Sequence, residues 1–210
     1  MKARARAGLQ RGVRRLVARV ESLLEIRAGD PLAQDFGRFG DGSVLGYPQR
    51  LVQHPEAITI GDRTTILCGA VLEAIHPTPE LLTIGSDCYF GYDIRLVALN
   101  GIHIADRVAL GHGTTLADTV HDYKRRDDDE ENWQAELRVG RPLIVEEGTW
   151  VGNNCVVTGG VVLGKGCIIA PNSVVTRDVP AHTLVGGSPL RAMRRRTPDG
   201  EWIDVDEQLP

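Results

Sequence analysis

Large apolar residues recur at every sixth position along most of this chain of 210 residues. The repeat is carried by Ile60, Ile66, Leu72, Ile84, Phe90, Leu96, Ile104, Leu110, Leu116, Val145, Val151, Val157, Leu163, Ile169 and Val175, and a weaker triplet precedes it at Phe39, Leu45 and Leu51. A small residue usually follows four positions later, and glycine or alanine often follows directly. Neither an α-helix nor an alternating strand has this period. A repeat of six residues is typical of a parallel β-helix.

The period has a simple geometric meaning. Three hexads close one triangular coil, so residues eighteen apart in an unbroken run stack at the strand spacing of about 4.8 Å. The large and the small residue of each hexad point inward, and glycine or alanine relieves the corners. We therefore predict an all-β fold of about six coils between residues 39 and 190, with residues 1–38 before them and a basic segment and acidic tail at 191–210. We expect the tail after Gly200 to be mobile.

Composition narrows the class of protein. The net charge of −4 and the pI of 5.9 argue against nucleic acid as a partner. A run of eighteen apolar residues and a signal-peptide core are both missing, which predicts a soluble, cytoplasmic chain. Cys88, Cys155 and Cys167 occupy the small inward position and Cys68 lies within a hexad, so we interpret all four as buried apolar residues. Their spacing predicts neither a disulfide framework nor a metal site.

Two segments lack the repeat. Residues 1–27 predict an amphipathic helix, with an apolar face at Leu9, Val13, Leu16, Val17, Val20, Leu23 and Leu24 and arginines elsewhere. We favour packing of this helix on the base of the prism or on a neighbouring subunit, and a peripheral membrane contact is the alternative. Residues 122–143 form a long polar loop directly after His121. A loop of this length inside a compact repeat is usually functional.

The C-terminal half resembles a known family. The matching motifs are Glu147 to Gly152, Val174 to Pro180, Gly187 to Arg191 and, before the loop, Asp118 to Tyr123. They resemble the hexapeptide-repeat acetyltransferases, which include galactoside, maltose and nodulation-factor O-acetyltransferases and enzymes that acetylate cell-surface polysaccharides. This resemblance implies a left-handed β-helix, a homotrimer with active sites between subunits, and acetyl-CoA as cosubstrate.

The resemblance also implies roles for individual residues. His121 matches the family's catalytic base, and a histidine of near-neutral pKa suits proton removal from a hydroxyl. Asp118, Asp122 or a backbone carbonyl would orient it, and a backbone N–H near Gly152 and Asn153 of a neighbouring subunit would stabilise the oxyanion. The implied contacts to acetyl-CoA are Asn153, Pro171, Thr176, Arg177, Arg191 and Arg194. The family usually has glycine or alanine at the position of Pro171. Because proline has no backbone N–H, it cannot donate the hydrogen bond to acetyl-CoA that the resemblance implies there.

Three further residues are candidates for the acceptor site. Trp150 matches an aromatic residue that lines this site in the family, and Asp93 matches a polar residue, usually asparagine, although a turn aspartate is a nearly equal reading. His103 lies eighteen residues before His121, which predicts that the two imidazoles stack in one outward column.

We therefore expect an acetyl-CoA-dependent O-acetyltransferase acting on a sugar or glycan hydroxyl. A serine- or xenobiotic-type acetyltransferase is an alternative. Two other classes compete: a γ-class carbonic anhydrase, whose paired histidines are five apart whereas His103, His112 and His121 are nine apart, and a non-catalytic β-helix.

Overall fold

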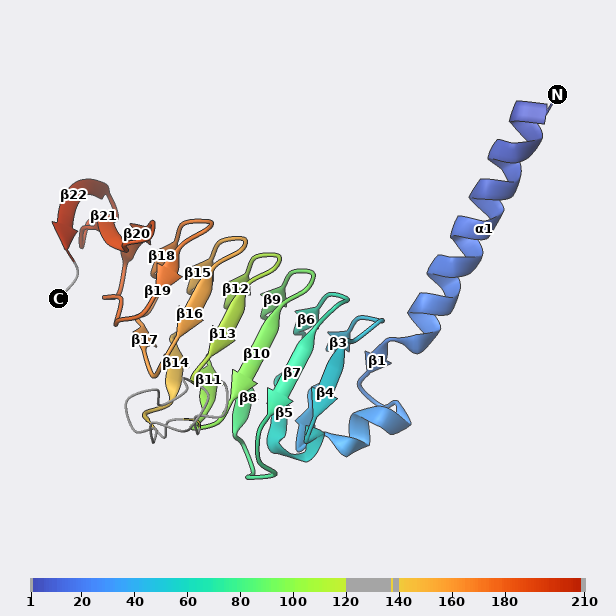
Figure 1. Cartoon of the computed structure of the whole chain (residues 1–210), viewed down its shortest axis with the longest axis horizontal. Helices are drawn as coiled ribbons and strands as arrows, with labels where there is room; N and C mark the ends of the chain where they lie inside the picture. Colours follow the sequence, from blue (N-terminus) through green and yellow to red (C-terminus); the bar gives the residue numbers. More distant parts are fainter. Residues whose placement is uncertain (1, 120–136, 138–139, 209–210) are drawn as a thin grey trace, which may run out of the picture.

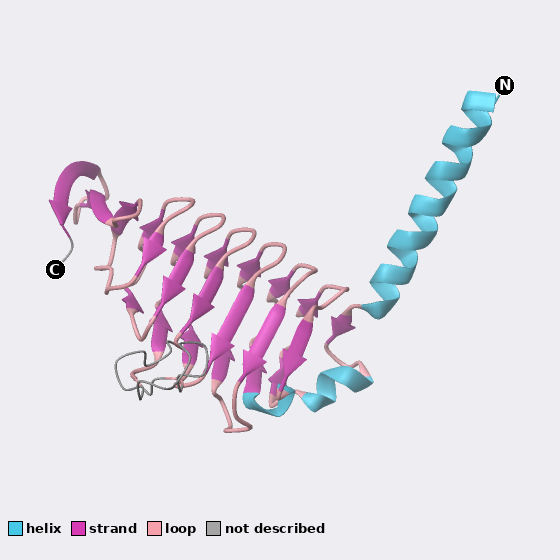
Figure 2. Ribbon diagram, in the orientation of Figure 1, coloured by secondary structure: helices cyan, strands magenta, loops and turns pink. Residues whose placement is uncertain are grey.

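The chain folds into a parallel β-helix of about six turns, preceded by one long helix (Figures 1 and 2). The computed structural model describes residues 2–119, 137 and 140–208. Each turn contributes one short strand to each of three sheets, which we call walls A, B and C. Successive strands of one wall are therefore far apart in sequence but adjacent in space, as the repeat predicts.

The elements before and within the walls have these bounds. The N-terminal region holds α1 (Lys2–Leu24), β1 (Ile26–Arg27) and two 3₁₀ segments, η1 (Pro31–Asp35) and η2 (Pro55–Ala57). Wall A continues from β1 through β3 (Val44–Leu45), β6 (Thr65–Ile66), β9 (Tyr89–Phe90), β12 (Ala109–Leu110), β15 (Trp150–Val151), β18 (Ile168–Ile169), β20 (Thr183–Gly186), β21 (Arg191–Arg196) and β22 (Trp202–Gln208). Wall B holds β2 (Arg38–Phe39), β5 (Ile58–Ile60), β8 (Leu82–Ile84), β11 (Ile102–Ile104), β14 (Leu143–Val145) and β17 (Val162–Leu163). Wall C holds β4 (Leu51–Gln53), β7 (Val71–Ala74), β10 (Arg95–Ala98), β13 (Thr115–Ala117), β16 (Val156–Thr158) and β19 (Val174–Val175).

The core is the column of repeat residues inside the prism. Every large apolar position from Ile60 to Val175 is buried, with at most 3% of its surface exposed. The small positions between them are buried as well, including Thr64, Thr114 and Ser173, whose hydroxyls bond to backbone carbonyls. The predicted inward faces are thus confirmed over the main run.

The first strand of wall C departs from the prediction. Leu51 is 41% exposed, and the strand partner of the buried Leu72 is Val52. Seven residues separate Leu45 from Val52, one more than the repeat allows. Because side chains alternate along a strand, this single extra residue turns Leu51 outward.

The spacing of eighteen holds where the hexads are unbroken. Val145 pairs with Leu163, Val151 with Ile169 and Val157 with Val175. Two turns earlier in wall B the spacing is twenty, since Ile84 pairs with Ile104. The two additional residues lie between Leu96 and Ile104, where the chain makes the turn 99–101.

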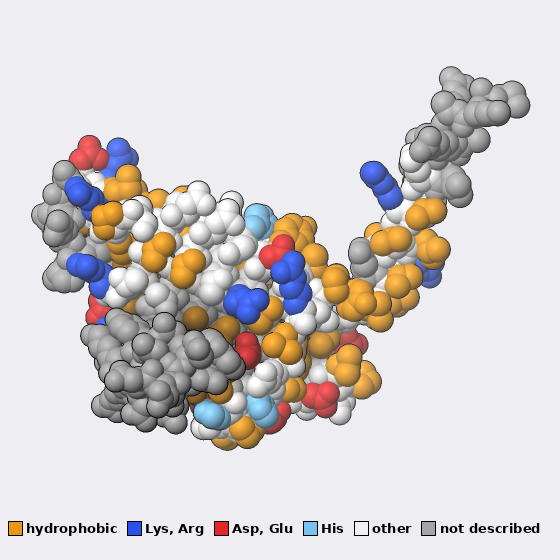
Figure 3. All heavy atoms as spheres, in the orientation of Figure 1, with side chains coloured by type: hydrophobic (Ala, Val, Ile, Leu, Met, Phe, Trp, Pro, Cys, Tyr) orange, Lys and Arg blue, Asp and Glu red, His pale blue; other side chains and the backbone are white. Residues whose placement is uncertain are grey.

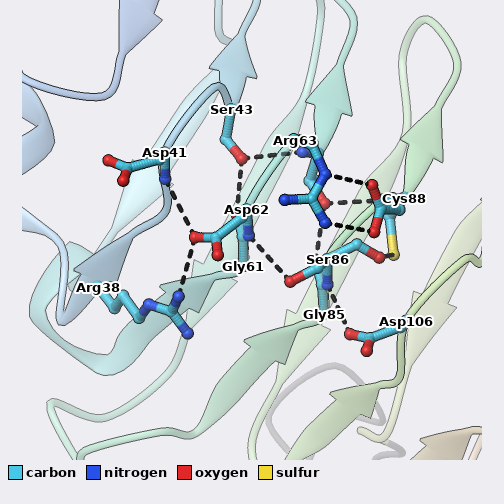
Figure 4. Close-up of polar contacts among 12 residues, drawn as sticks. Arg38, Asp41, Ser43, Gly61, Asp62, Arg63, Gly85, Ser86, Cys88 and Asp106 are labelled. Atoms are coloured by element: carbon cyan, nitrogen blue, oxygen red, sulfur yellow. Dashed lines mark hydrogen bonds and ion pairs between the residues drawn. The ribbon is translucent and has the colours of Figure 1, made fainter.

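Polar side chains link successive turns at the corners (Figure 4). The Asp62 carboxylate accepts hydrogen bonds from Arg38 and from the backbone N–H of Asp41, and the Asp62 N–H donates to Ser86 Oγ at 3.0 Å. The Ser86 N–H donates in turn to Asp106 Oδ1 at 2.7 Å. These bonds satisfy backbone donors that the short strands leave unpaired.

The same corner carries charges of alternating sign along the helix axis: Arg63, Asp87, Arg107, Glu147 and Lys165. The hydrogen bond from Arg63 lowers the pKa of the Asp87 carboxyl, and that from Lys165, together with the charge of Arg107, lowers the pKa of Glu147. Because these groups are exposed, we expect the row of charges to contribute little to the free energy of unfolding. We assign it a role in solubility and in the register of the turns.

Three expectations for the chain ends and the loop need correction. The helix α1 ends at Leu24 and extends away from the first coil, so it does not pack on the base of its own prism (Figure 1). The tail expected to be mobile forms β22 on β21, because its alternating residues pair antiparallel with the basic strand. Leu143, placed at the end of the loop, is a buried residue of β14.

The cysteines are free, and Cys88, Cys155 and Cys167 are buried as predicted, whereas Cys68 is half-buried. Among the described helices there is none whose length and apolarity would let it cross a bilayer.

Candidate active site

The segments before and after residues 120–139 are linked by one hydrogen-bond network centred on the buried Asp118. The chain leaves wall C after β13, where the buried Asp118 accepts hydrogen bonds from the backbone N–H groups of Leu99, Asn100 and Gly101 at 2.7, 2.7 and 2.6 Å. The Asn100 side chain donates to the Asp118 carbonyl at 3.2 Å and accepts from the Gly140 N–H at 2.8 Å. One asparagine therefore bonds to the segments that precede and follow the loop.

Asp118 is accordingly committed to the backbone. Burial raises the pKa of its carboxyl, and the three N–H donors act in the opposite direction. Both carboxylate oxygens accept bonds from the turn 99–101, which makes Asp118 an anchor for the strand that leads to His121. His121 and Asp122 lie outside the described residues, so the role of His121 remains a prediction.

His103 does not have the neighbour that the spacing predicts. Its strand partners in wall B are Thr83 and Ile144, and its Nδ1 lies 3.0 Å from the Thr83 hydroxyl. The position next to His103 in the following turn is thus taken by Ile144. The predicted column of His103 and His121 is wrong because the loop intervenes before wall B resumes. His103 instead lines a cavity of about 430 Å³ with Ile144 and Lys165.

A larger cavity lies at the C-terminal end of the prism. Its volume is about 650 Å³, and its lining includes Ala170, the segment 186–189, Arg191 and Met193. Strand β22 closes one side with Asp204 and Val205. A Cβ on Gly186 would lie 3.0 Å from both the Ala170 Cβ and the Met193 Sδ, so the glycine spares the floor of this cavity a tight contact.

The structure brings some of the predicted acetyl-CoA contacts together. Asn153 and Pro171 lie at the same corner in successive turns, where the Asn172 N–H donates to the Asn153 carbonyl at 2.9 Å. Arg191 lines the cavity beside Ala170, the residue before Pro171. These three predicted contacts therefore share one end of wall A.

The remaining contacts lie elsewhere or have other partners. Thr176 and Arg177 are exposed directly after β19, on wall C. The Arg194 Nε donates to Asp204 Oδ1 at 2.7 Å, a partner that the sequence did not suggest because the tail was expected to be mobile. The Asn153 side chain accepts a hydrogen bond from the His112 N–H at 2.9 Å.

The other two acceptor candidates, Trp150 and Asp93, differ in their surroundings. Trp150 is 55% exposed on the outer face of wall A, as predicted from its place before Val151. Asp93 adopts a left-handed backbone conformation with φ of 57° and forms an ion pair with Arg50 at 2.8 Å. Its geometry favours the turn reading over an acceptor contact.

The histidines give no support to a zinc site. His103 lies on wall B, whereas His112 follows β12 of wall A and stacks on Tyr92 with ring centroids 5.0 Å apart. Within residues 2–119, 137 and 140–208, we find no cluster of three His, Cys, Asp or Glu side chains that would hold a metal ion.

The repeat, the three walls and the C-terminal cavity together define a hexapeptide-repeat β-helix protein. The family model described as bacterial transferase hexapeptide (six repeats) matches residues 142–177. Residues 142–177 are thus similar to this family, in line with the resemblance of the sequence motifs.

Its relatives include sugar-modifying enzymes. Galactoside O-acetyltransferase of Lactococcus lactis is 27% identical over 59% of this chain and 60% of its own length. Nodulation protein L of Rhizobium meliloti is 32% identical over 52% of this chain and 57% of its own length. The chain thus matches less than two thirds of either relative. Among solved structures, a mutant of the N-acyltransferase AntD of Bacillus cereus, in complex with dTDP and coenzyme A, has a TM-score of 0.70 at 18% identity, covering 82% of this chain and 91% of its own, which demonstrates the shared fold.

Proposed function

We propose that this protein is an acetyl-CoA-dependent O-acetyltransferase whose acceptor is a hydroxyl of a sugar or a cell-surface glycan precursor. The observation that carries the proposal is the C-terminal cavity, which is lined by Gly187, Ser188, Pro189 and Arg191 of the segment that resembles a motif of the family. The similarity to a galactoside O-acetyltransferase favours a sugar hydroxyl. We place the reaction in the cytoplasm, where free cysteines persist.

The cavity suits one arm of acetyl-CoA. Its floor is glycine backbone at residues 186 and 187, which admits a close approach, and its rim carries the Arg191 guanidinium. A guanidinium pairs well with phosphate oxygens. The volume of about 650 Å³ is within the range of small-molecule sites.

The proposed chemistry is a direct transfer. The imidazole of His121 removes the proton of the acceptor hydroxyl while its oxygen attacks the thioester carbonyl. The oxyanion that forms is stabilised by a backbone N–H near Asn153 of a neighbouring subunit, and its collapse breaks the C–S bond. The thiolate of CoA leaves and takes up the proton held by His121.

The test measures CoA release with galactosides as acceptors, together with CoA affinity by calorimetry. We expect His121→Ala to lower kcat by about 10²–10⁴-fold, the usual cost of losing a general base, with CoA affinity unchanged. Near-normal turnover of this variant would refute the assignment of His121.

A second pair of variants tests the cavity. Arg191→Gln should weaken CoA binding about tenfold or more, since it removes a charge-assisted contact to phosphate. Arg194→Gln is the matched control: Arg194 bonds to Asp204 and does not line the cavity, so its loss should weaken binding less. Equal affinity of Arg191→Gln and the parent protein would exclude this cavity as the CoA site.

A further inference from the structure

The charge of this protein is divided between the helix and the solenoid. Residues 1–24 contain seven Lys or Arg and one Glu, a net charge of +6. The whole chain has a net charge of −4, so residues 25–210 carry −10. A basic helix on an acidic body is the charge pattern of a protein that meets an anionic surface at one end.

The helix also exposes a continuous apolar stripe. Six residues of α1 on one face are between 45% and 77% exposed: Val13, Leu16, Val17, Val20, Leu23 and Leu24. Their spacing of three and four residues places them on one face of the helix, while Arg14, Arg15 and Arg19 occupy the remainder. Figure 3 shows this apolar surface along the helix, with lysine and arginine side chains beside it.

The position of the helix leaves this stripe accessible. Figure 1 shows that α1 extends away from the first coil and that its N-terminal part is remote from all three walls. Exposed apolar stripes of this kind mark interaction surfaces rather than ordinary protein surface. The length of the helix, 23 residues, is common among helices that lie in a lipid interface.

We propose that α1 docks in the plane of an anionic lipid bilayer, with the stripe from Val13 to Leu24 buried among the acyl chains and the arginines at the headgroups. Each lysine or arginine near such a surface is attracted by the negative charge of the lipid headgroups. The same surface repels the acidic solenoid, which therefore stays in water while the helix anchors it. A spanning orientation does not fit, since α1 lacks the apolarity to cross the bilayer.

Charge decides between lipid and a second copy of the chain. A bundle of α1 helices would bury the same stripe, but it would bring together helices of net charge +6 with one glutamate each. Like charges at this density oppose association. An anionic lipid surface satisfies the apolar stripe and the arginines at once.

The experiment is vesicle co-sedimentation of the full chain. We expect binding to vesicles of phosphatidylcholine with phosphatidylglycerol, weak binding to phosphatidylcholine alone, and loss of binding as salt is raised. Leu16→Ser should lower the partition coefficient by about tenfold or more, because a buried leucine is lost. Leu32→Ser is the matched control: Leu32 is 58% exposed, close to the 63% of Leu16, but lies in η1 outside the stripe.

The charge arm uses a triple variant, Arg14→Gln with Arg15→Gln and Arg19→Gln, which should lower binding to anionic vesicles by about a hundredfold. Turnover on a soluble acceptor should be unchanged in all these variants, so this proposal and the proposed catalytic function can fail independently. Equal binding to neutral and anionic vesicles, or equal effects of Leu16→Ser and Leu32→Ser, would overturn it. So would a fall in the oligomer mass of Leu16→Ser without vesicle binding by the parent, which would assign the stripe to a second copy.

Discussion

Asp118 holds three backbone N–H groups in a turn that the six-residue repeat does not contain. Replacing it with asparagine puts an amide NH₂ where one oxygen accepts the bonds of Asn100 and Gly101. A buried donor facing two donors is costly, and we expect Asp118→Asn to lower the free energy of unfolding by about 1–3 kcal/mol. Urea denaturation measures this change.

Asp93→Asn provides the control for that prediction. Asp93 is half-exposed and pairs with Arg50, so its replacement should change stability by less than about 1 kcal/mol. If Asp118→Asn lost activity while keeping the stability of the parent, Asp118 would act on His121 rather than anchor the turn.

Cys167 offers a second prediction at this scale. Burial raises the pKa of its thiol to about 11, so at pH 8 only about one thousandth of it is thiolate. Iodoacetamide at pH 8 should therefore modify the half-buried Cys68 before Cys167, and the rate at Cys167 should rise as the pH approaches 11. Peptide mass spectrometry reads both sites, and rapid labelling of Cys167 in the folded protein at pH 8 would contradict the burial.

At the scale of single elements, the strands of the main run follow directly from the repeat, because each hexad alone determines which residue points inward. The register of β4 was predicted incorrectly. Leu51 fits the period of six, so the sequence pattern did not show that one extra residue precedes this strand. Leu72→Ala should cost about 2–5 kcal/mol, whereas Leu51→Ala on the neighbouring strand should cost less than about 1 kcal/mol. Similar losses of unfolding free energy in Leu51→Ala and Leu72→Ala would support the register predicted from the sequence, in which Leu51 points inward.

The terminal elements were harder to predict from sequence. The tail after Gly200 has the acidic composition of a solvated segment, yet it alternates apolar and polar residues and pairs with the basic β21. The apolar residues Trp202, Ile203 and Val205 indicate a strand. Its pairing partner, the strand that contains Arg194, is known only from the structure. The amphipathic pattern of α1 was predicted correctly. Its direction away from the prism is set by the backbone between α1 and β1, which the sequence pattern does not describe.

For the whole molecule, the candidate site is only partly recoverable from the chain. The sequence resemblance names residues, and the fold brings Asn153, Pro171 and Arg191 to one end of wall A. The sequence alone did not predict that His103 pairs with Ile144. Because the repeat stops between Leu116 and Val145, the residue at which wall B resumes could not be predicted. The turn 99–101 was equally hidden, although the two additional residues after Leu96 mark it.

The proposed trimer is the prediction that belongs to this scale. Trp150, Pro171 and Thr176 lie exposed on outer faces, and a single flat wall offers little enclosure for a substrate. Light scattering should give three times the chain mass of 22.9 kDa. If each site is shared between subunits, His121→Ala chains refolded with Asn153→Pro chains, which lack the backbone N–H proposed to stabilise the oxyanion, should recover part of the activity. An active monomer would contradict the shared site.

The bonds of Asn100 have a consequence for how this fold can change. Its side chain bonds to Asp118, before the loop, and to Gly140, after it. The points at which the chain leaves and rejoins the prism are therefore close together. Loop closure costs little more free energy for a long insertion than for a short one. The prism should therefore tolerate exchange of this segment for one of different length and composition, and a loop grafted from a relative should leave the stacking of β13, β16 and β19 intact.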